Sequence, residues 1–351
     1  YRGLHHFFRQ NLSPVTNPPV ESLRERHVMT LGTRIGNSGN ILDEAPDQCD
    51  HLLLKSPVLN SSEFNALNAW LGDKAVSIDA TFTPNGDDHL AAALDRIERD
   101  AEDAVRGGAE HIMLVDYNTS DERMAIPSIL AAGAVHAHLV RKQLRTFASI
   151  NVASGECLDV HHFAVLMGVG ATTVNPWMAE QAIADRHQRG LIPNISLEDA
   201  VSNYRKAIEN GLLKIMSKMG ISVLSSYRGG YNFEALGLSR SLVSKYFPPM
   251  TSRVSGLGLS GIESQLKAIH DEAWAVDKII LPVGGFFRFR KSGEAHAFDA
   301  DVIHSMQHAC DTGSYDSWKN YTSKVYKAGP VNLRDLLDFT EGHKAIDLDE
   351  V

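Results

Sequence analysis

From residue 75 onward, the apolar and polar positions of this chain alternate between two spacings. Short apolar runs such as AVSIDATF (75–82) and HIMLV (111–115) have the composition of buried strands. Between them, residues 88–106 carry apolar side chains three and four positions apart, the spacing of one buried helix face. The same pattern predicts further strands at 52–54, 147–152, 171–175 and 222–226. It predicts further helices at 126–141, 159–167, 178–189 and 196–219, the last with Ser196 as N-cap and Gly211 as a candidate break.

Strands and helices that alternate in this way form βαβ units, in which successive strands lie parallel in one sheet. We therefore predict an α/β fold with a mostly parallel sheet. A barrel-like or partial-barrel arrangement of the βα repeats is favoured over an open doubly wound sheet, although both architectures share the local alternation.

Changes in composition divide the chain into three regions. Residues 1–50 form an extended N-terminal segment, because NLSPVTNPP (11–19) contains three prolines and GTRIGNSGN (32–40) is rich in turn residues. Residues 51–290 form the βα-repeat body, which ends in an aromatic and basic strand at 286–290. Residues 291–351 form a helical region with an acidic end, which we expect to be a linker into a further domain. Its helices are predicted at 299–310, 314–326 and 333–339.

Charge and composition exclude several classes of function. The 43 Asp and Glu residues outnumber the 34 Lys and Arg residues, and the net charge of −9 disfavours nucleic acid or an anionic membrane as partner. No apolar run approaches the roughly 20 residues that cross a bilayer, and the N-terminus lacks the pattern of a signal peptide. A cytoplasmic location is therefore expected. Cys49, Cys157 and Cys310 lie too far apart in sequence for a local zinc or iron–sulfur loop.

Two motifs have both a chemical and a structural interpretation. GLGLSG (256–261) matches the glycine pattern of dinucleotide sites and precedes a predicted helix, but residues 252–255 before it are poor strand formers. A glycine-rich turn is the favoured interpretation. The histidine pairs have spacings that place their two imidazoles on different faces of a helix, so structural histidines are favoured over metal ligands. These pairs are His136 with His138 and His161 with His162.

Asp79, Asp116 and Asn151 lie at or near the C-terminal ends of predicted strands, and in a barrel this edge carries the functional groups. Capping of the following helices or turns is the favoured alternative for such residues. Glu156 is expected in the first turn of a helix, at the positive end of its dipole.

Glycines next to basic residues flank the predicted strand at 222–226. Lys218 in SKMG (217–220) and Arg228 in YRGG (227–230) could hold a phosphate, or could equally be ion-paired surface residues. The chain has no Ser-His-Asp order, nucleophile elbow or Walker loop that would indicate an independent hydrolase or nucleotidase.

Four long segments of this chain resemble the central domain of the large (alpha) subunit of glutamate synthase. The resemblance runs from about residue 7 to the end, because YKAGPVNLRDLLDF (326–339) resembles the connection into that family's FMN domain. The four segments are FFRQNLSPVTNPPVESLRERHVMTLGTRIGNSGNIL (7–42), IPSILAAGAVHAHLVRKQLR (126–145), VHHFAVLMGVGATTVNPWMA (160–179) and NYRKAIENGLLKIMSKMGISVLSSYRGGYNFEALGL (203–238).

The resemblance implies that the parent enzyme is a large cytoplasmic amidotransferase and flavoprotein. Its glutaminase domain releases ammonia from glutamine, and an FMN domain with an iron–sulfur cluster adds the ammonia reductively to 2-oxoglutarate, giving two L-glutamates. The reductant would reach it through a small NADPH-oxidising subunit or ferredoxin. No catalytic residue, cofactor or metal site is expected in this segment, because the chain opens with Tyr1 rather than a nucleophilic cysteine and has no cysteine cluster.

The resemblance also assigns the proline segment to the passage that carries ammonia between the two active sites. Two prolines would hold the backbone rigid without offering N–H groups, while a hydroxyl and an amide would supply polar contacts. The candidates are Val15, Thr16, Asn17, Pro18, Pro19 and Val20. Tyr117 stands where the family commonly has an Arg after the strand Asp, which leaves the partner of Asp116 open. An independent flavin- or phosphate-binding (β/α) barrel enzyme is the alternative function.

Overall fold

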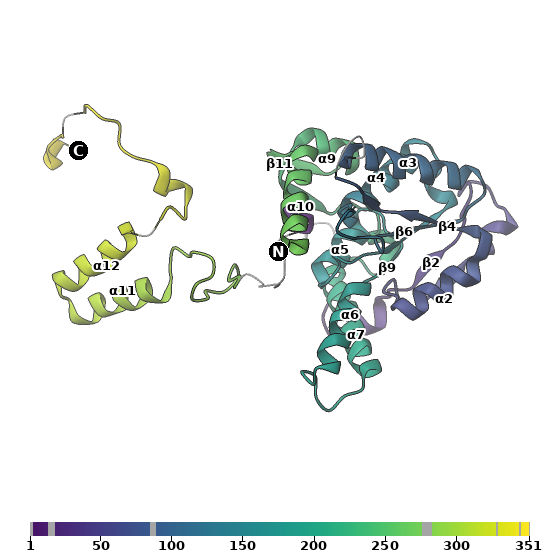
Figure 1. The fold of residues 1–351 in the computed structure, drawn as a ribbon, viewed down its shortest axis with the longest axis horizontal. Helices are drawn as coiled ribbons and strands as arrows, with labels where there is room; N and C mark the ends of the chain where they lie inside the picture. Colours follow the sequence, from purple (N-terminus) through teal and green to yellow (C-terminus); the bar gives the residue numbers. More distant parts are fainter. Residues whose placement is uncertain are drawn as a thin grey trace. The chain divides into compact units, whose positions relative to one another are not determined.

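A computed structural model describes residues 3–12, 18–84, 89–275, 283–327, 329–343 and 345–350, without the side chains of Arg26 and Asp47. The chain divides into two compact units, residues 2–276 and residues 277–351 together with Tyr1. The first unit contains all the strands of the described chain, and the second contains two helices and short 3₁₀ turns (Figure 1).

The first unit is organised around a four-stranded parallel sheet with the order β4-β6-β8-β9. Each neighbour in this order is also the next strand of the sheet along the chain. The sheet therefore advances in one direction, as barrel strands do, whereas a doubly wound sheet reverses at a switch point. The predicted α/β fold with a mostly parallel, partial-barrel arrangement is confirmed. The strands are β4 (Ala75–Asp79), β6 (His111–Val115), β8 (Ser149–Ala153) and β9 (Thr173–Asn175).

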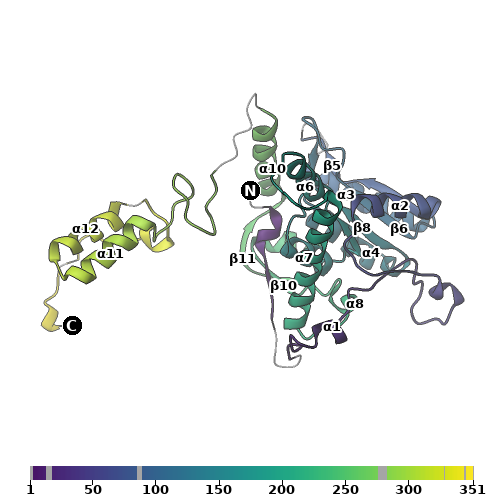
Figure 2. The same cartoon turned by 90° about the horizontal axis from the view of Figure 1, so that it is seen from below.

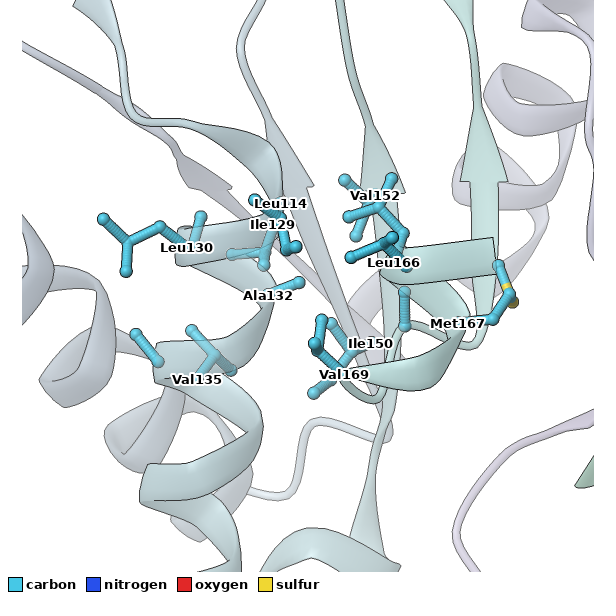
Figure 3. Close-up of a cluster of buried hydrophobic side chains, with 14 of the residues drawn as sticks. Leu114, Ile129, Leu130, Ala132, Val135, Ile150, Val152, Leu166, Met167 and Val169 are labelled. Atoms are coloured by element: carbon cyan, nitrogen blue, oxygen red, sulfur yellow. The ribbon is translucent and has the colours of Figure 1, made fainter. Parts of the chain in front are cut away.

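The helices that connect these strands pack against one another, α3 on α4 and α4 on α5, and α7, which follows the sheet, packs on α5. Figure 3 shows the core between the sheet and helices α4 and α5, where strand residues such as Ile150 and Val152 meet Ile129 and Leu166. All four side chains are at most 2% exposed. The helices are α3 (Leu90–Arg106), α4 (Ser128–Arg141), α5 (Val160–Gly168), α6 (Trp177–Gln188) and α7 (Leu197–Lys218).

Three smaller sheets flank the parallel one. In the order β1-β10-β11, β1 pairs antiparallel with β10 and joins the N-terminal segment to residues 233–235, while β11 lies parallel to β10. The other two sheets are the antiparallel pairs β2-β3 and β5-β7. The strands are β1 (Phe8–Gln10), β2 (Thr33–Ile35), β3 (Leu52–Leu54), β5 (Thr81–Phe82), β7 (Met124–Ala125), β10 (Phe233–Leu238) and β11 (Thr251–Leu257).

The remaining elements of the first unit are short helices, apart from α10. They are α1 (Glu25–Val28), α2 (Ser61–Leu71), α8 (Leu224–Tyr227), α9 (Arg240–Tyr246) and α10 (Leu259–Trp274), with 3₁₀ turns at Leu4–Phe7, Pro46–Cys49, Gly72–Lys74 and Arg145–Phe147. In the second unit α11 (Ala300–Thr312) and α12 (Tyr315–Lys327) pack side by side (Figure 2), followed by 3₁₀ turns at Leu333–Leu336 and Leu348–Glu350. In the parts of the chain covered by the structure, no helix combines the length and apolar character needed to span a bilayer.

Local predictions failed where tertiary contacts override the sequence pattern. Residues 222–226 form no strand: Val223 makes an isolated bridge to Thr30, and helix α8 begins at the next residue. Residues 286–290 are also not a strand, whereas 252–255 belong to β11. Gly211 does not interrupt α7. A side chain there would overlap Val160 of α5, so the glycine permits the two helices to approach closely.

Candidate functional site

The C-terminal edge of the parallel sheet brings Asp79 and Asp116 to the ends of neighbouring strands, as the sequence predicted. Asp79 is the last residue of β4, and its carboxylate is held by three other residues. It accepts hydrogen bonds from the backbone N–H (3.0 Å) and hydroxyl (2.7 Å) of Thr81, from Nδ2 of Asn118 (3.0 Å) and from the guanidinium of Arg123 (3.1 Å). The carboxylate therefore fixes the turn into β5 and the loop after β6.

Asp116 follows β6 directly and is only 4% exposed. One carboxylate oxygen accepts from the indole Nε1 of Trp177 at 2.6 Å, and the other accepts from the backbone N–H of Gly155 at 2.8 Å. Trp177 is the first residue of α6, and Gly155 lies just beyond β8. Burial raises the pKa of Asp116, although both hydrogen bonds oppose that shift. The side chain thus ties together the ends of β6, β8 and β9.

Asn151 does not lie at this edge. It is inside β8, fully buried, and its Oδ1 accepts a hydrogen bond of 2.7 Å from the hydroxyl of Thr173 on β9. Asn175 takes the expected edge position at the end of β9. Its Oδ1 accepts from the Tyr117 hydroxyl at 3.2 Å, and its Nδ2 donates to the carbonyl of Leu59 at 3.1 Å. The end of the run ATTVN was the signal that could have identified Asn175.

Glu156 caps the N-terminus of α4 and not that of α5, the helix that follows it in the chain. Its carboxylate accepts from the backbone N–H of Ser128 at 2.7 Å and from the Ser128 hydroxyl at 3.0 Å, at the first residue of α4. The N-cap of α5 is instead Asp159, which accepts from the N–H of His162. Glu156 therefore links the β8–α5 connection to α4.

A cleft of about 580 Å³ lies beside the end of β9, between α2, α6 and α7. Two of its polar side chains are already engaged: Glu180 accepts from the backbone N–H of Ser61 at 3.0 Å, and Arg205 forms an ion pair with Glu63 at 2.8 Å. Burial raises the pKa of Glu180. The sheet edge and this cleft thus present side chains that hold the fold together, which favours the capping interpretation of Asp79 and Asp116.

Both histidines of the first pair contact neighbouring ionisable side chains. His138 lies between two carboxylates, with Nδ1 3.3 Å from Glu98 and Nε2 2.7 Å from Glu102. His136, on another face of α4, accepts at Nδ1 a hydrogen bond of 2.9 Å from Nε of Arg145. Burial and the charges of Arg145 and Arg228 lower the pKa of His136 to about 3, so its imidazole is neutral at pH 7.

The second histidine pair makes mainly backbone contacts. Nε2 of His161 lies 3.0 Å from the carbonyl of His5, and Nδ1 of His162 accepts from the backbone N–H of Leu158 at 3.1 Å. Within the residues that the structure describes, no group of three or more His, Cys, Asp or Glu side chains is arranged to hold a metal ion.

The glycines of the GLGLSG motif serve packing. Gly256 lies inside β11, where a side chain would overlap the backbone of Gly237 on β10. Gly258 is the N-cap of α10, and a side chain at Gly261 would contact Leu257 at 2.8 Å. The predicted glycine-rich turn is therefore a strand end followed directly by a helix start.

Of the proline segment, Val15, Thr16 and Asn17 lie outside the described residues. Pro18 and Pro19 are exposed, and Val20 packs in part against the core. The backbone N–H of Val20 donates to the carbonyl of Ser217 at 2.8 Å.

Glu25 supplies a second anchor for this segment. Its carboxylate accepts from the Ser217 hydroxyl at 2.8 Å and from Nζ of Lys214 at 3.0 Å. The segment after the prolines is thus fastened to the C-terminal turn of α7.

The two basic residues next to glycines, Lys218 and Arg228, do not form the ion pairs that one interpretation of the sequence predicted. Lys218 is exposed at the end of α7, and neither Lys218 nor Arg228 forms a hydrogen bond or ion pair through its side chain with any residue that the structure describes. An ion-paired surface is therefore the wrong description of both.

Comparison with known proteins identifies the family. A family profile described as the glutamate synthase central domain matches residues 1–239, so the chain belongs to the glutamate synthase central domain family. The large chain of NADPH glutamate synthase from Azospirillum brasilense is 56% identical over 352 residues, covering 100% of this chain and 23% of the relative. The corresponding Bacillus subtilis protein is 37% identical, with coverages of 100% and 23%. Ferredoxin-dependent glutamate synthase from Pyropia yezoensis is 36% identical, with coverages of 99% and 23%. This chain therefore spans about a quarter of the length of these relatives.

Proposed function

We propose that this chain is the non-catalytic connecting part of a glutamate synthase large chain. The complete enzyme would convert L-glutamine, 2-oxoglutarate and reductant into two L-glutamates in the cytoplasm. This segment would hold the glutaminase and FMN domains of the same chain in register and would help to form the passage for ammonia. The family match carries the proposal.

The hydrogen bonding at the sheet edge supports a structural role for this segment. In a catalytic barrel the corresponding edge offers side chains to a substrate. Here Asp116 uses both oxygens on Trp177 and Gly155, and Asp79 is held by Thr81, Asn118 and Arg123. These carboxylates would have to break internal hydrogen bonds before they could act on a ligand, at a cost of about 1–3 kcal/mol for each buried donor left unpaired.

FMN and the iron–sulfur cluster are expected in parts of the enzyme outside this chain. The described residues do not fit either group, because Asp79 is bonded to Thr81, Asn118 and Arg123, Asp116 is bonded to Gly155 and Trp177, and the three cysteines do not form a cluster within either unit. Cys157 is buried, while Cys49 and Cys310 are exposed in different units. The electron donor would be NADPH through a small subunit, or ferredoxin, and would be received by those other parts.

The anchored proline segment supports a role in the ammonia passage. Val20 and Glu25 fasten it to α7, so the rigid prolines before Val20 start from a fixed point. Pro18, Pro19 and Val20, together with Thr16 and Asn17, remain the proposed wall residues. Pro18 and Pro19 have no backbone N–H, so this part of the wall would offer ammonia no donor to bind.

The test is a coupling measurement in the full-length enzyme. Thr16→Ala combined with Asn17→Ala should release ammonia to solvent, so that fewer than two glutamates form per glutamine hydrolysed. Ser22→Ala, at an exposed position just after the segment, is the matched control and should keep the full yield. Unchanged coupling in the double variant would contradict the passage assignment.

A further inference from the structure

The loop after α8 is held tightly against the end of α5. The backbone N–H of Gly229 donates to the carbonyl of Met167 at 3.0 Å, and that of Tyr231 donates to the carbonyl of Gly168 at 3.1 Å. Gly229 and Tyr231 both have left-handed backbones, with φ of +68° and +48°. Arg228 is therefore presented by a loop of fixed conformation rather than by a free surface chain.

His136 lies directly against this loop. A Cβ built on Gly229 would be 3.2 Å from Cε1 and 3.5 Å from Nε2 of His136, and the ring centroids of His136 and Tyr231 are 5.8 Å apart. Because Nδ1 accepts the Arg145 hydrogen bond, the proton of the neutral imidazole must be on Nε2. His136 thus turns an N–H donor toward the loop.

Arg145 is the rigid support of this arrangement. Besides His136, its guanidinium donates to the carbonyls of Ala148 at 2.6 Å and Gly170 at 2.8 Å. Its positive charge therefore meets carbonyl and imidazole acceptors, and among the described residues it meets no carboxylate. Burial, together with the nearby charge of Arg228, lowers the pKa of Arg145 to about 9.

Around the loop, donors exceed acceptors. The guanidinium of Arg228, Nε2–H of His136 and the buried hydroxyl of Tyr231 have no hydrogen-bond partner in the described parts of the chain. The Arg228 side chain is partly removed from water, and this burial lowers its pKa. Unpaired donors and an uncompensated charge are costly, and an anion with several acceptor oxygens would satisfy them together.

We propose that the Arg228–Tyr231 loop binds a small free oxyanion, with a phosphate or carboxylate group accepting from the Arg228 guanidinium, Nε2–H of His136 and the Tyr231 hydroxyl. A guanidinium suits this ligand because its parallel N–H groups match two oxygens of either group. The proposal is independent of the ammonia passage, which involves other residues.

The test is a titration of the 351-residue chain at pH 7 with inorganic phosphate and, in a separate arm, with acetate. Binding is followed by calorimetry and by the ¹⁵N-edited NMR signals of the arginine side chains. The account predicts saturable binding of at least one probe, with the Arg228 signal shifting in the same concentration range. The arm with the lower dissociation constant identifies the group.

Three variants make the result specific. Arg228→Gln should weaken binding roughly tenfold or more, since hydrogen bonds to charged groups contribute about 1.5–3 kcal/mol. Tyr231→Phe, which keeps the ring and tolerates the same backbone, should weaken it about two- to tenfold. Arg34→Gln is the control of equal charge change, because Arg34 is exposed on β2 and likewise has no side-chain partner among the described residues.

Two results would overturn the proposal. One is the absence of saturable binding of both probes to the unaltered chain. The other is binding that Arg228→Gln and Tyr231→Phe leave unchanged, or that Arg34→Gln weakens as strongly as Arg228→Gln. The NMR spectrum of each variant reports directly whether the variant is folded. If Arg228→Gln does not fold, Tyr231→Phe still tests the proposal.

Discussion

The edge of the parallel sheet and the loop at Arg228 are both rich in partly buried polar side chains. They differ in whether each hydrogen-bonding group has a partner within the described chain. At the edge, the carboxylate of Asp116 meets two donors, Trp177 and Gly155, at hydrogen-bond distance. At the loop, Arg228 and the Tyr231 hydroxyl are donors without acceptors among the described residues. A set of polar groups that satisfies itself holds the fold, whereas a set that lacks acceptors marks the place of a missing partner.

The largest effect is expected at the satisfied edge. Asp116→Ala removes the acceptor of two hydrogen bonds and leaves the Trp177 indole and the Gly155 N–H unpaired, so the free energy of unfolding should fall by about 2–4 kcal/mol. Urea unfolding followed by circular dichroism measures it. Asp121→Ala, at an exposed position of the same loop, should change it by no more than about 0.5 kcal/mol. If both substitutions lowered the free energy of unfolding equally, the hydrogen bonds of Asp116 would not stabilise the fold more than an exposed residue of the same loop does.

Next to the loop, the buried His136 should make the free energy of unfolding depend on pH. The pKa of His136 is lowered from 6.5 to about 3, so between these values the unfolded chain binds a proton that the folded chain does not. Its contribution to stability is therefore full above pH 6.5 and is lost as the pH falls, by up to about 1.4 kcal/mol per pH unit. His136→Asn, which retains an acceptor for Arg145, should reduce this loss on acidification. Identical pH profiles of the two proteins would contradict the assignment.

The edge should respond to pH with the opposite sign. Burial raises the pKa of Asp116 above its ordinary value of 3.8, so the folded chain keeps the proton longer than the unfolded chain. The contribution of this group to stability therefore falls as the pH rises from about 4 toward its folded pKa. Asp116→Asn should remove that slope, measured as the difference between the two unfolding profiles across this range. A slope of the reverse sign would mean that the two hydrogen bonds outweigh burial.

The smallest effect on stability is expected at Arg228. Because its guanidinium has no partner in the described structure, Arg228→Gln breaks no hydrogen bond or ion pair and should change the free energy of unfolding by no more than about 0.5 kcal/mol. The free energy of unfolding of this variant is measured by the same urea unfolding experiment as that of Asp116→Ala, so the two values can be compared directly. A loss of 2 kcal/mol or more would show that Arg228 is a structural residue like Asp116.

The sequence predicted best those elements that have a continuous buried run or a clear capping residue. The run HIMLV is strand β6 with unchanged bounds, and the Ser196 hydroxyl caps α7 by accepting from the N–H of Asp199. Residues 222–226 were predicted wrongly as a strand, because their apolar pattern is equally compatible with the single turn of α8. In the structure the strand pairing is limited to a single bridge between Val223 and Thr30, and helix α8 begins at Leu224.

The sequence predicted where the polar side chains of the sheet edge lie, but not which residues they form hydrogen bonds with. Strand ends placed Asp79 and Asp116 correctly, since the ends of parallel strands meet at one edge. Their partners Trp177 and Arg123 come from other loops, so the closure of the edge could not be deduced from the sequence. The same limit applies to Arg228, where the sequence left phosphate binding and an ion-paired surface equally open, and the absence of an acceptor among the described residues became visible only in the fold.

The most direct test of the closed sheet edge is a calorimetric titration of the purified 351-residue chain with FMN. A visible spectrum recorded beforehand would detect flavin retained from expression. The account predicts no retained flavin and no heat of binding, because Asp79 and Asp116 are committed to internal hydrogen bonds. Tight one-to-one binding of FMN would contradict it and would favour an independent flavin-binding barrel enzyme instead.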